Sequence, residues 1–389
     1  MRVLSPDRGW ICLLGAIWTL VLSAGMAGSA AAQQQPISDQ AAFRDMVNAN
    51  TVTILGGSMT GTYLRLADDI ARTVGDKHNL RILPIRGGGA PDNIRDILYL
   101  RGIDMGMVTA DSVETFRGKR FFESISDRMA YITKLYNAEF HVLVGPDVQS
   151  LSDLDGKIVA YHGSGSKISG QLLFRRLNVK PAKWVKMLMF EGAQKIKEGK
   201  VAAVVRSTGK PVRGIDRVLK INPEIRLLPL QYDDVLVETP YLPTRFTHQD
   251  YPSLVPKGET IQTIAVGVAL AVYNWKPGTD RYRRLEKFVN AFFSKFDKIV
   301  SRKGRHPKWD EVNIAAKLPG WKRFGPAQRW LEENRMTASS VRSGSSLERQ
   351  FKAFLEQRRS AGRFVPGNTD AEGLFAEFVR WRDRDRRRQ

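Results

Sequence analysis

Glycine occurs together with serine, threonine or a cationic side chain in five short segments, each lying where a strand-like stretch gives way to a helix-like one. Glycine allows a ligand to approach the backbone closely, and the unpaired N–H groups at the start of a helix attract anions. Hydroxyl, amide and cationic side chains beside them can bond a carboxylate. Each segment alone is more typical of a simple helix cap, so the prediction depends on their number and placement. The segments are residues 56–63 (GGSMTGTY), 86–93 (RGGGAPDN), 109–112 (TADS), 163–166 (GSGS) and 206–209 (RSTG).

Patterns for covalent or metal chemistry are weaker. Residues 164–167 match the S-x-x-K pattern of penicillin-recognising enzymes, but the K-T-G and S-D-N partners are missing. The five histidines form no H-x-x-x-H or H-E-x-x-H pair, and we expect His141 and His162 to be core or cleft residues rather than bases. Cys12 is the only cysteine. We therefore expect no metal, no cofactor and no enzymatic activity, and a serine hydrolase using Ser164 is the weakest alternative.

The five segments are positioned by an alternation of strand-like and helix-like stretches. Strands separated by short helices predict βαβ units and parallel sheets. One block ends before about residue 130 and the other starts after about 150, so we expect two sheets and two lobes whose loops face one cleft. Strands are expected at 51–55, 80–85, 105–109, 157–161, 185–189 and 202–206, and helices at 62–74, 92–100, 111–116 and 168–177.

Two further features predict how the chain passes between the lobes. Residues 129–135 and 139–144 are strand-like with no helix between them, which is typical of a crossing segment. The apolar run at 262–273 predicts a buried strand that completes the first lobe. The predicted fold is therefore α/β and two-lobed. We expect lobe 1 at 50–135 plus about 240–300, lobe 2 at 136–239, and a helical, basic C-terminal extension at 301–389.

The N-terminus predicts export. Arg2 and Arg8 precede an apolar run over 10–21, and small residues follow up to Ala32. This order indicates a secretory signal peptide at 1–32, cleaved after about Ala32, whereas an uncleaved membrane anchor is the alternative. The formal charge of +21 suits nucleic acid, an anionic membrane or acidic small molecules. Export makes nucleic acid the least expected of these partners.

In the order of these loops the sequence resembles the TAXI-type solute-binding proteins of tripartite (TRAP) transporters. The resemblance covers about residues 50–300, with a fainter match through Trp309 and Trp321. It is carried by 56–63, Gly88, Gly89, Asn93, 102–113, 135–144 and 152–165. The resemblance implies a periplasmic protein of the type II binding fold. Its lobes would close by a hinge on a small carboxylate such as glutamate, which is then delivered to permease subunits.

The resemblance also implies site residues. In lobe 1 these are Ser58, Thr60, Gly61, Thr62, Tyr63, Thr109 and Asp111, to which the loop at 86–93 adds Arg86, Gly88 and Asn93. In lobe 2 they are Ser164, Gly165, Ser166, Ser207 and Thr208. Arg86 stands where the family has a small hydroxyl residue, so it either pairs with the ligand's carboxylate or lies on the rim. The basic extension keeps one alternative open, an envelope interaction or sensor protein on the same scaffold.

Overall fold

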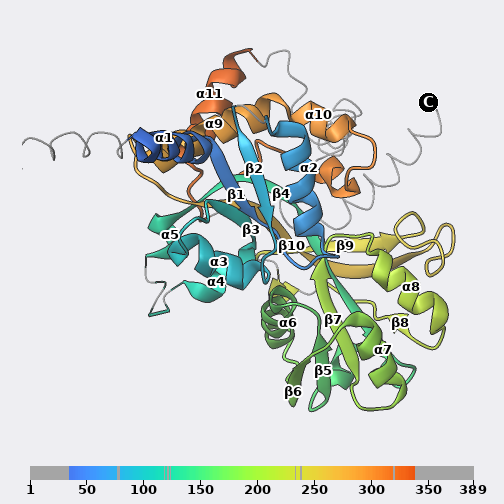
Figure 1. Cartoon of the computed structure of the whole chain (residues 1–389). Helices are drawn as coiled ribbons and strands as arrows, with labels where there is room; N and C mark the ends of the chain where they lie inside the picture. Colours follow the sequence, from blue (N-terminus) through green and yellow to red (C-terminus); the bar gives the residue numbers. More distant parts are fainter. Residues whose placement is uncertain are drawn as a thin grey trace, which may run out of the picture. The chain divides into compact units, whose positions relative to one another are not determined.

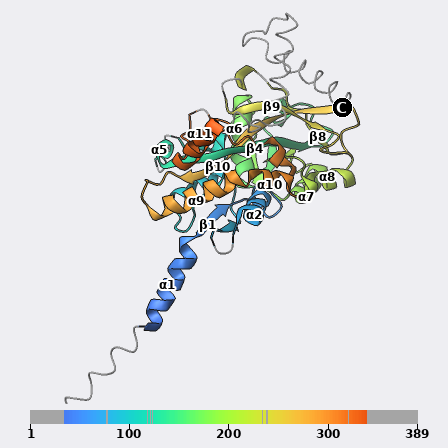
Figure 2. The same ribbon diagram turned by 90° about the horizontal axis from the view of Figure 1, so that it is seen from above.

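The computed structural model divides the chain into two units, residues 1–49 and 50–389. It describes residues 35–76, 79–117, 119–120, 122, 124–232, 234–236, 239–318 and 320–337. The predicted signal peptide, Cys12 and residues 338–389 lie outside the described residues. The first unit contains α1 (Gln35–Ala49), and the second contains all other described elements (Figures 1 and 2). None of the described helices combines the length and apolar character that a membrane span requires.

The second unit is built on one continuous sheet, where the sequence predicted two. Its main path runs β2 (Arg81–Ile85), β1 (Thr51–Leu55), β3 (Met105–Thr109), β10 (Thr260–Tyr273), β4 (Met129–Val144), β7 (Ala203–Thr208), β5 (Ile158–Tyr161), β6 (Lys183–Lys186). Two strands lie off this path: β8 (Arg226–Leu227) pairs with β4, and β9 (Tyr241–Thr247) pairs with β10.

The long strand β4 joins the two halves of this sheet. It pairs antiparallel with β10 from Met129 to Glu139, and with β7 from Glu139 to Val144. Glu139 is thus paired on both sides, opposite Ala265 and Thr208. The two predicted segments at 129–135 and 139–144 are therefore one strand. We call the part around β1–β3 the first lobe and the part around β5–β7 the second lobe.

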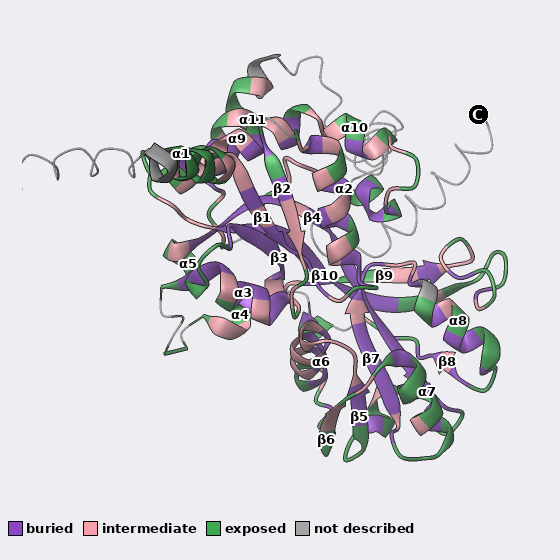
Figure 3. Ribbon diagram, in the orientation of Figure 1, coloured by how far each residue is buried: buried purple, intermediate pink, exposed green. Residues whose placement is uncertain are grey.

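Helices cover each lobe where their apolar faces meet the sheet (Figures 1 and 3). In α2, Leu66, Ala67, Ile70 and Val74 are all buried, in agreement with the helical spacing that predicted this helix. The first lobe carries α2 (Thr62–Val74), α3 (Ala90–Tyr99), α4 (Ala110–Phe116), α5 (Ile125–Arg128), α9 (Asp280–Ser294), α10 (Phe296–Ser301) and α11 (Gly325–Thr337). The second lobe carries α6 (Ser164–Arg176), α7 (Met189–Lys197) and α8 (Arg213–Ile221), and three 3₁₀ turns complete the fold: η1 (Leu151–Leu154), η2 (Asp234–Leu236) and η3 (Pro307–Glu311).

The chain after Ser301 packs against the first lobe. Asp69 of α2 holds it through three contacts, because its carboxylate pairs with Arg302 and accepts bonds from the His306 N–H and Trp309 Nε1. Trp309 and Leu331 belong to the main hydrophobic core. The predicted limits of the lobes and of the C-terminal extension stay predictions, because one sheet runs through both lobes and the core continues to Leu331.

Candidate functional site

The ends of the strands bring four of the predicted loops to one place, where helices start. Strand β1 leads through Gly56–Gly57 to α2, β2 leads to α3, β3 leads directly to α4, and β5 leads to α6. Gly89 and Gly163, the residues just before α3 and α6, have φ values of 124° and 90°. Such a backbone favours glycine, which therefore allows each strand to turn directly into its helix. Residues at the starts of these helices line one small space, and the first N–H groups of a helix have no acceptor within the helix.

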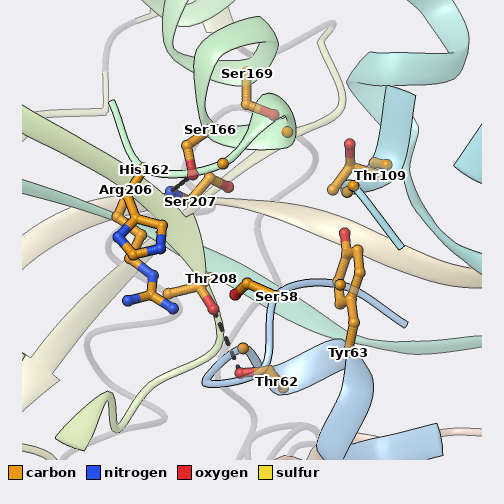
Figure 4. A pocket seen from close by; sticks show the side chains of 17 residues that line it. Ser58, Thr62, Tyr63, Thr109, His162, Ser166, Ser169, Arg206, Ser207 and Thr208 are labelled. Atoms are coloured by element: carbon orange, nitrogen blue, oxygen red, sulfur yellow. Dashed lines mark hydrogen bonds between the residues drawn. The ribbon is translucent and has the colours of Figure 1, made fainter. Parts of the chain in front are cut away.

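That space is an inner cavity of about 70 Å³ between the lobes (Figure 4). Hydroxyl groups dominate its lining: Ser58, Tyr63 and Thr109 face it from the first lobe, and Ser166 and Ser169 from the second. Predicted site residues among its lining are Ser58, Gly61, Thr62, Tyr63, Gly88, Thr109, Gly165, Ser166, Ser207 and Thr208. The structure therefore brings residues from all five predicted segments together.

A larger outer cavity, of about 410 Å³, adjoins the inner one. Thr62, His162, Arg206 and Thr208 line both. The predicted residue Thr60 lines only the outer cavity. Its remaining lining is Arg65, Met189, Pro211, Val212, Gly214 and His306. None of the described residues that line either cavity is acidic.

Four predicted residues line neither cavity, and two of them are buried beside the site. Asn93 is buried under the loop and donates hydrogen bonds to the carbonyl oxygens of Gly56 and Met107, both at 2.8 Å. It therefore fixes the start of the Gly56–Gly61 turn to β3. Asp111 is also buried, and its carboxylate accepts a bond from the Tyr241 hydroxyl at 3.3 Å. Burial raises the pKa of Asp111.

The other two are Ser164 and Arg86. Ser164 Oγ lies 2.7 Å from the carbonyl oxygen of Gly88 and 2.7 Å from Asp92 Oδ2. Because Gly88 and Asp92 belong to the first lobe, the serine joins the lobes. No histidine among the described residues is hydrogen-bonded to it, as a hydrolase would require. Arg86 is exposed, which agrees with the rim position that the sequence left open.

Arg206 is the residue of greatest consequence that the predicted site lacked. It lies on β7 and is 4 % exposed. Its guanidinium has no ion pair or hydrogen bond to any residue that the structure describes, and burial lowers its pKa. A buried cation without a counter-ion is costly, so this side chain is prepared for an anion. The sequence did contain a sign of this role, because Arg206 is the first residue of the predicted binding segment 206–209.

The predicted site also lacked His162, which follows β5 and lies next to Arg206 (Figure 4). Burial and the Arg206 charge lower the pKa of His162 to about 4, so the ring is neutral at pH 7. Its Nδ1 atom is buried and has no hydrogen-bond partner among the described residues. The remaining lining residues that were not predicted are Gly57, Gly89, Ala90, Gly163 and Ser169.

The lobes are in contact around the cavities, so this arrangement is closed. Thr62 Oγ1 donates to the carbonyl oxygen of Gly209 at 3.2 Å and lies 3.4 Å from Thr208 Oγ1 (Figure 4). At the crossing strand, Lys308 Nζ lies 2.5 Å from Glu139 Oε1. Thr62 of the first lobe thus contacts the second lobe beside both cavities, and Lys308 contacts the strand that the two lobes share.

The fold and site define a two-lobed α/β protein with a cavity between its lobes, lined by hydrogen-bond donors and by the buried Arg206, which has no ion pair with any described residue. Residues 54–333 match the NMT1-like family, and the chain belongs to that family. No curated protein matches the sequence.

Three solved structures have similar folds at low scores. One titled as a periplasmic transporter has 13% identity and a TM-score of 0.41, covering 75% of this chain and 97% of its own. The substrate-binding protein of an amino acid ABC transporter has 13% identity, a TM-score of 0.37, and coverage of 66% and 100%. Holo ArgBP from T. maritima has 14% identity, a TM-score of 0.37, and coverage of 65% and 93%. Similarity at this level is too low to transfer a ligand.

Proposed function

We propose that this protein is a solute-binding protein that closes two lobes on a small anionic metabolite and carries out no catalysis. The anion, a carboxylate in the first instance, binds the Arg206 guanidinium. Hydroxyl groups of Ser58, Ser166 and Thr208 and the helix-start N–H groups give it further hydrogen bonds. An acid such as glutamate fits this description.

The observation that carries the proposal is the unpaired charge of Arg206. Arginine stays protonated in proteins even when burial lowers its pKa. The other polar residues that line the two cavities are hydroxyl residues, neutral histidines and the exposed Arg65, and none of the described lining residues is acidic. A bound carboxylate would supply the missing counter-ion and accept two parallel hydrogen bonds from the guanidinium.

The order of the loops, which resembles the TAXI family, extends the proposal to the partner. We propose delivery of the ligand to permease subunits of a TRAP-type transporter, in the periplasm, after removal of residues 1–32. The lobes would open and close through β4 and β10, the two long strands that run from one lobe toward the other. The contacts of Ser164 and Thr62 favour the closed state.

Replacing Arg206 by methionine tests the proposal. The protein is freed of co-purified ligand by unfolding and refolding, then titrated with glutamate, 2-oxoglutarate and succinate in a calorimeter. Charge-assisted hydrogen bonds contribute about 1.5–3 kcal/mol each, so Arg206→Met should weaken binding by about 100-fold or more. The variant without ligand should be at least as stable as the wild type, because it lacks an unpaired buried cation.

Arg86→Met is the matched control, since Arg86 is exposed and lines neither cavity. Its affinity should equal that of the wild type. Equal affinities of the wild type and Arg206→Met for every acid that binds would overturn the role of Arg206. A ligand-free Arg206→Met that unfolds more readily than the wild type would instead make the arginine a structural group.

A further inference from the structure

We infer that the ligand extends beyond the inner cavity, with its acid group at Arg206 and an apolar chain or ring in the outer cavity. The inference rests on the proposed function, because it names the class of anion that the same site takes. That class is an acid with a hydrocarbon body, rather than a small polar acid alone.

The sizes of the two cavities give the first argument. The inner cavity holds about 70 Å³, which suits a group of a few atoms, and the outer one holds about 410 Å³. Drug-sized and metabolite ligands occupy spaces on the order of 300–1,000 Å³. Arg206 lines both cavities, so an acid held on its guanidinium has direct access to each. A ligand confined to the inner cavity would leave the larger space unused.

The chemistry of the outer walls gives the second argument. The second lobe presents Met189, Pro211 and Val212, which offer carbon atoms, and a methionine adapts to ligands of different shape. The first lobe presents His306, whose Nδ1 atom accepts a bond from the Lys308 N–H at 3.1 Å. Burial, reinforced by the charge of Arg65, lowers the pKa of His306 to about 3, so the ring is uncharged at neutral pH. Arg65 also lines this cavity, but it is an exposed residue, so a hydrocarbon would contact the carbon atoms of the second-lobe wall.

A series of straight-chain carboxylates tests the inference. Acetate, butanoate and hexanoate are titrated into the ligand-free protein, with hexanamide as the uncharged control. Each added CH₂ should tighten binding by about fourfold while the chain enters the outer cavity. Hexanamide should bind far more weakly than hexanoate. An affinity that changes by less than about twofold from acetate to hexanoate would overturn the inference.

Gly214 allows the outer cavity to be filled without a clash. It lines that cavity, and a Cβ atom at this position would meet no atom within 4 Å. Gly214→Phe should abolish the gain of hexanoate over acetate, because the phenylalanine ring would occupy the space that the chain needs. Lys220→Phe is the control, because Lys220 is exposed on the same helix and lines neither cavity. Gly214→Leu repeats the test with a smaller side chain, should the phenylalanine variant not fold.

The outcomes separate the inference from the proposed function. A gain with chain length that survives in both Gly214 variants would put the hydrocarbon elsewhere and overturn the inference. Glutamate or succinate binding that depends on Arg206, without any gain along the carboxylate series, would keep the proposed function and end the inference. A failure of every acid to bind would end both.

Discussion

The Ser164 hydroxyl lies between the lobes, within 2.7 Å of acceptors on Gly88 and Asp92. Removing it should weaken the closed state by the value of one interlobe hydrogen bond, roughly 0.5–1.5 kcal/mol. We expect Ser164→Ala to bind ligand about three- to tenfold more weakly, mainly through faster dissociation, as measured by stopped-flow kinetics.

Ser301→Ala serves as the control, because Ser301 is an exposed serine of α10 whose hydroxyl bonds only within its own helix. Its dissociation rate should match that of the wild type. A Ser164→Ala variant with an unchanged dissociation rate would show that this contact does not hold the lobes together.

Arg86 and Arg206, the two arginines of the predicted binding segments, show which site residues could not be identified from the sequence. The sequence drew attention to Arg86, in a loop, but the structure leaves it exposed, whereas Arg206 is buried between the cavities. A charged residue inside a predicted strand is usually expected on a solvated face. Arg206 lies on the same face of β7 as Val204 and Thr208. This face becomes part of a binding site only because the first lobe packs against it.

Strand β4 carries a buried histidine whose protonation opposes folding. His141 Nδ1 lies 3.1 Å from the carbonyl oxygen of Glu139, and Nε2 lies 2.7 Å from the Tyr251 hydroxyl. That hydroxyl accepts a bond from the Val212 N–H at 3.1 Å, so it donates to the histidine, which is then neutral. Burial lowers the pKa of His141 to about 3.

A lowered histidine pKa makes the folded state less able to bind the proton than the unfolded state. The contribution of His141 to the free energy of unfolding is therefore complete above pH 6.5 and declines as the pH falls toward about 3. The decline should be about 1.4 kcal/mol per pH unit within that window. His141→Gln should show a shallower slope by that amount in urea unfolding measured from pH 7 to 4.

The pH dependence of the unfolding free energy must be compared between the wild type and His141→Gln, because Glu139 on the same strand changes that free energy with pH in the opposite direction. Burial raises its pKa to about 7 despite the nearby Lys308, so its contribution is complete below pH 4.5 and declines as the pH rises toward 7. This term is common to both proteins and cancels in the difference. Identical slopes for the wild type and His141→Gln would contradict the neutral, buried state of the histidine.

The limits of helices and strands were predicted correctly where the apolar residues follow a single helical or strand spacing. The helix predicted at 62–74 and the strands at 51–55 and 105–109 have those limits in the structure, because their apolar residues follow one clear spacing. Strand β9 was not predicted, since its buried and exposed positions do not alternate and it contains Pro243. Helix α6 starts at Ser164 rather than at the predicted 168, because Gly163 lets the helix begin immediately after β5.

For the whole molecule, local patterns predicted the alternation of strands and helices but not the order of the strands in the sheet. That order depends on contacts far apart in the chain: β10 inserts between β3 and β4, more than 120 residues after either begins. The prediction of two sheets failed for the same reason, because local patterns do not reveal that β4 pairs on both sides of Glu139. The prediction of one cleft lined by five loops needed only that both sets of strand ends face each other.

The net charge of the whole chain bears on how an anion reaches this cleft. A formal charge of +21, together with cavities that contain no acidic lining residue, should attract anionic ligands over a distance that salt shortens. We expect the association rate of an anionic ligand to fall by about tenfold between 20 and 300 mM NaCl, with little change in its dissociation rate. Stopped-flow measurements at several salt concentrations check this.

Deleting residues 338–389 tests how much the charges of this C-terminal tail contribute to the salt dependence of the association rate. This segment holds twelve arginine and lysine residues against seven aspartate and glutamate residues, so its loss lowers the formal charge only from +21 to +16. All residues that line the two cavities remain. The truncated protein should therefore keep most of the salt dependence and bind ligand with unchanged affinity. Loss of the salt dependence on truncation would assign the attraction of anions to the tail, and a loss of affinity would make the tail part of the binding site.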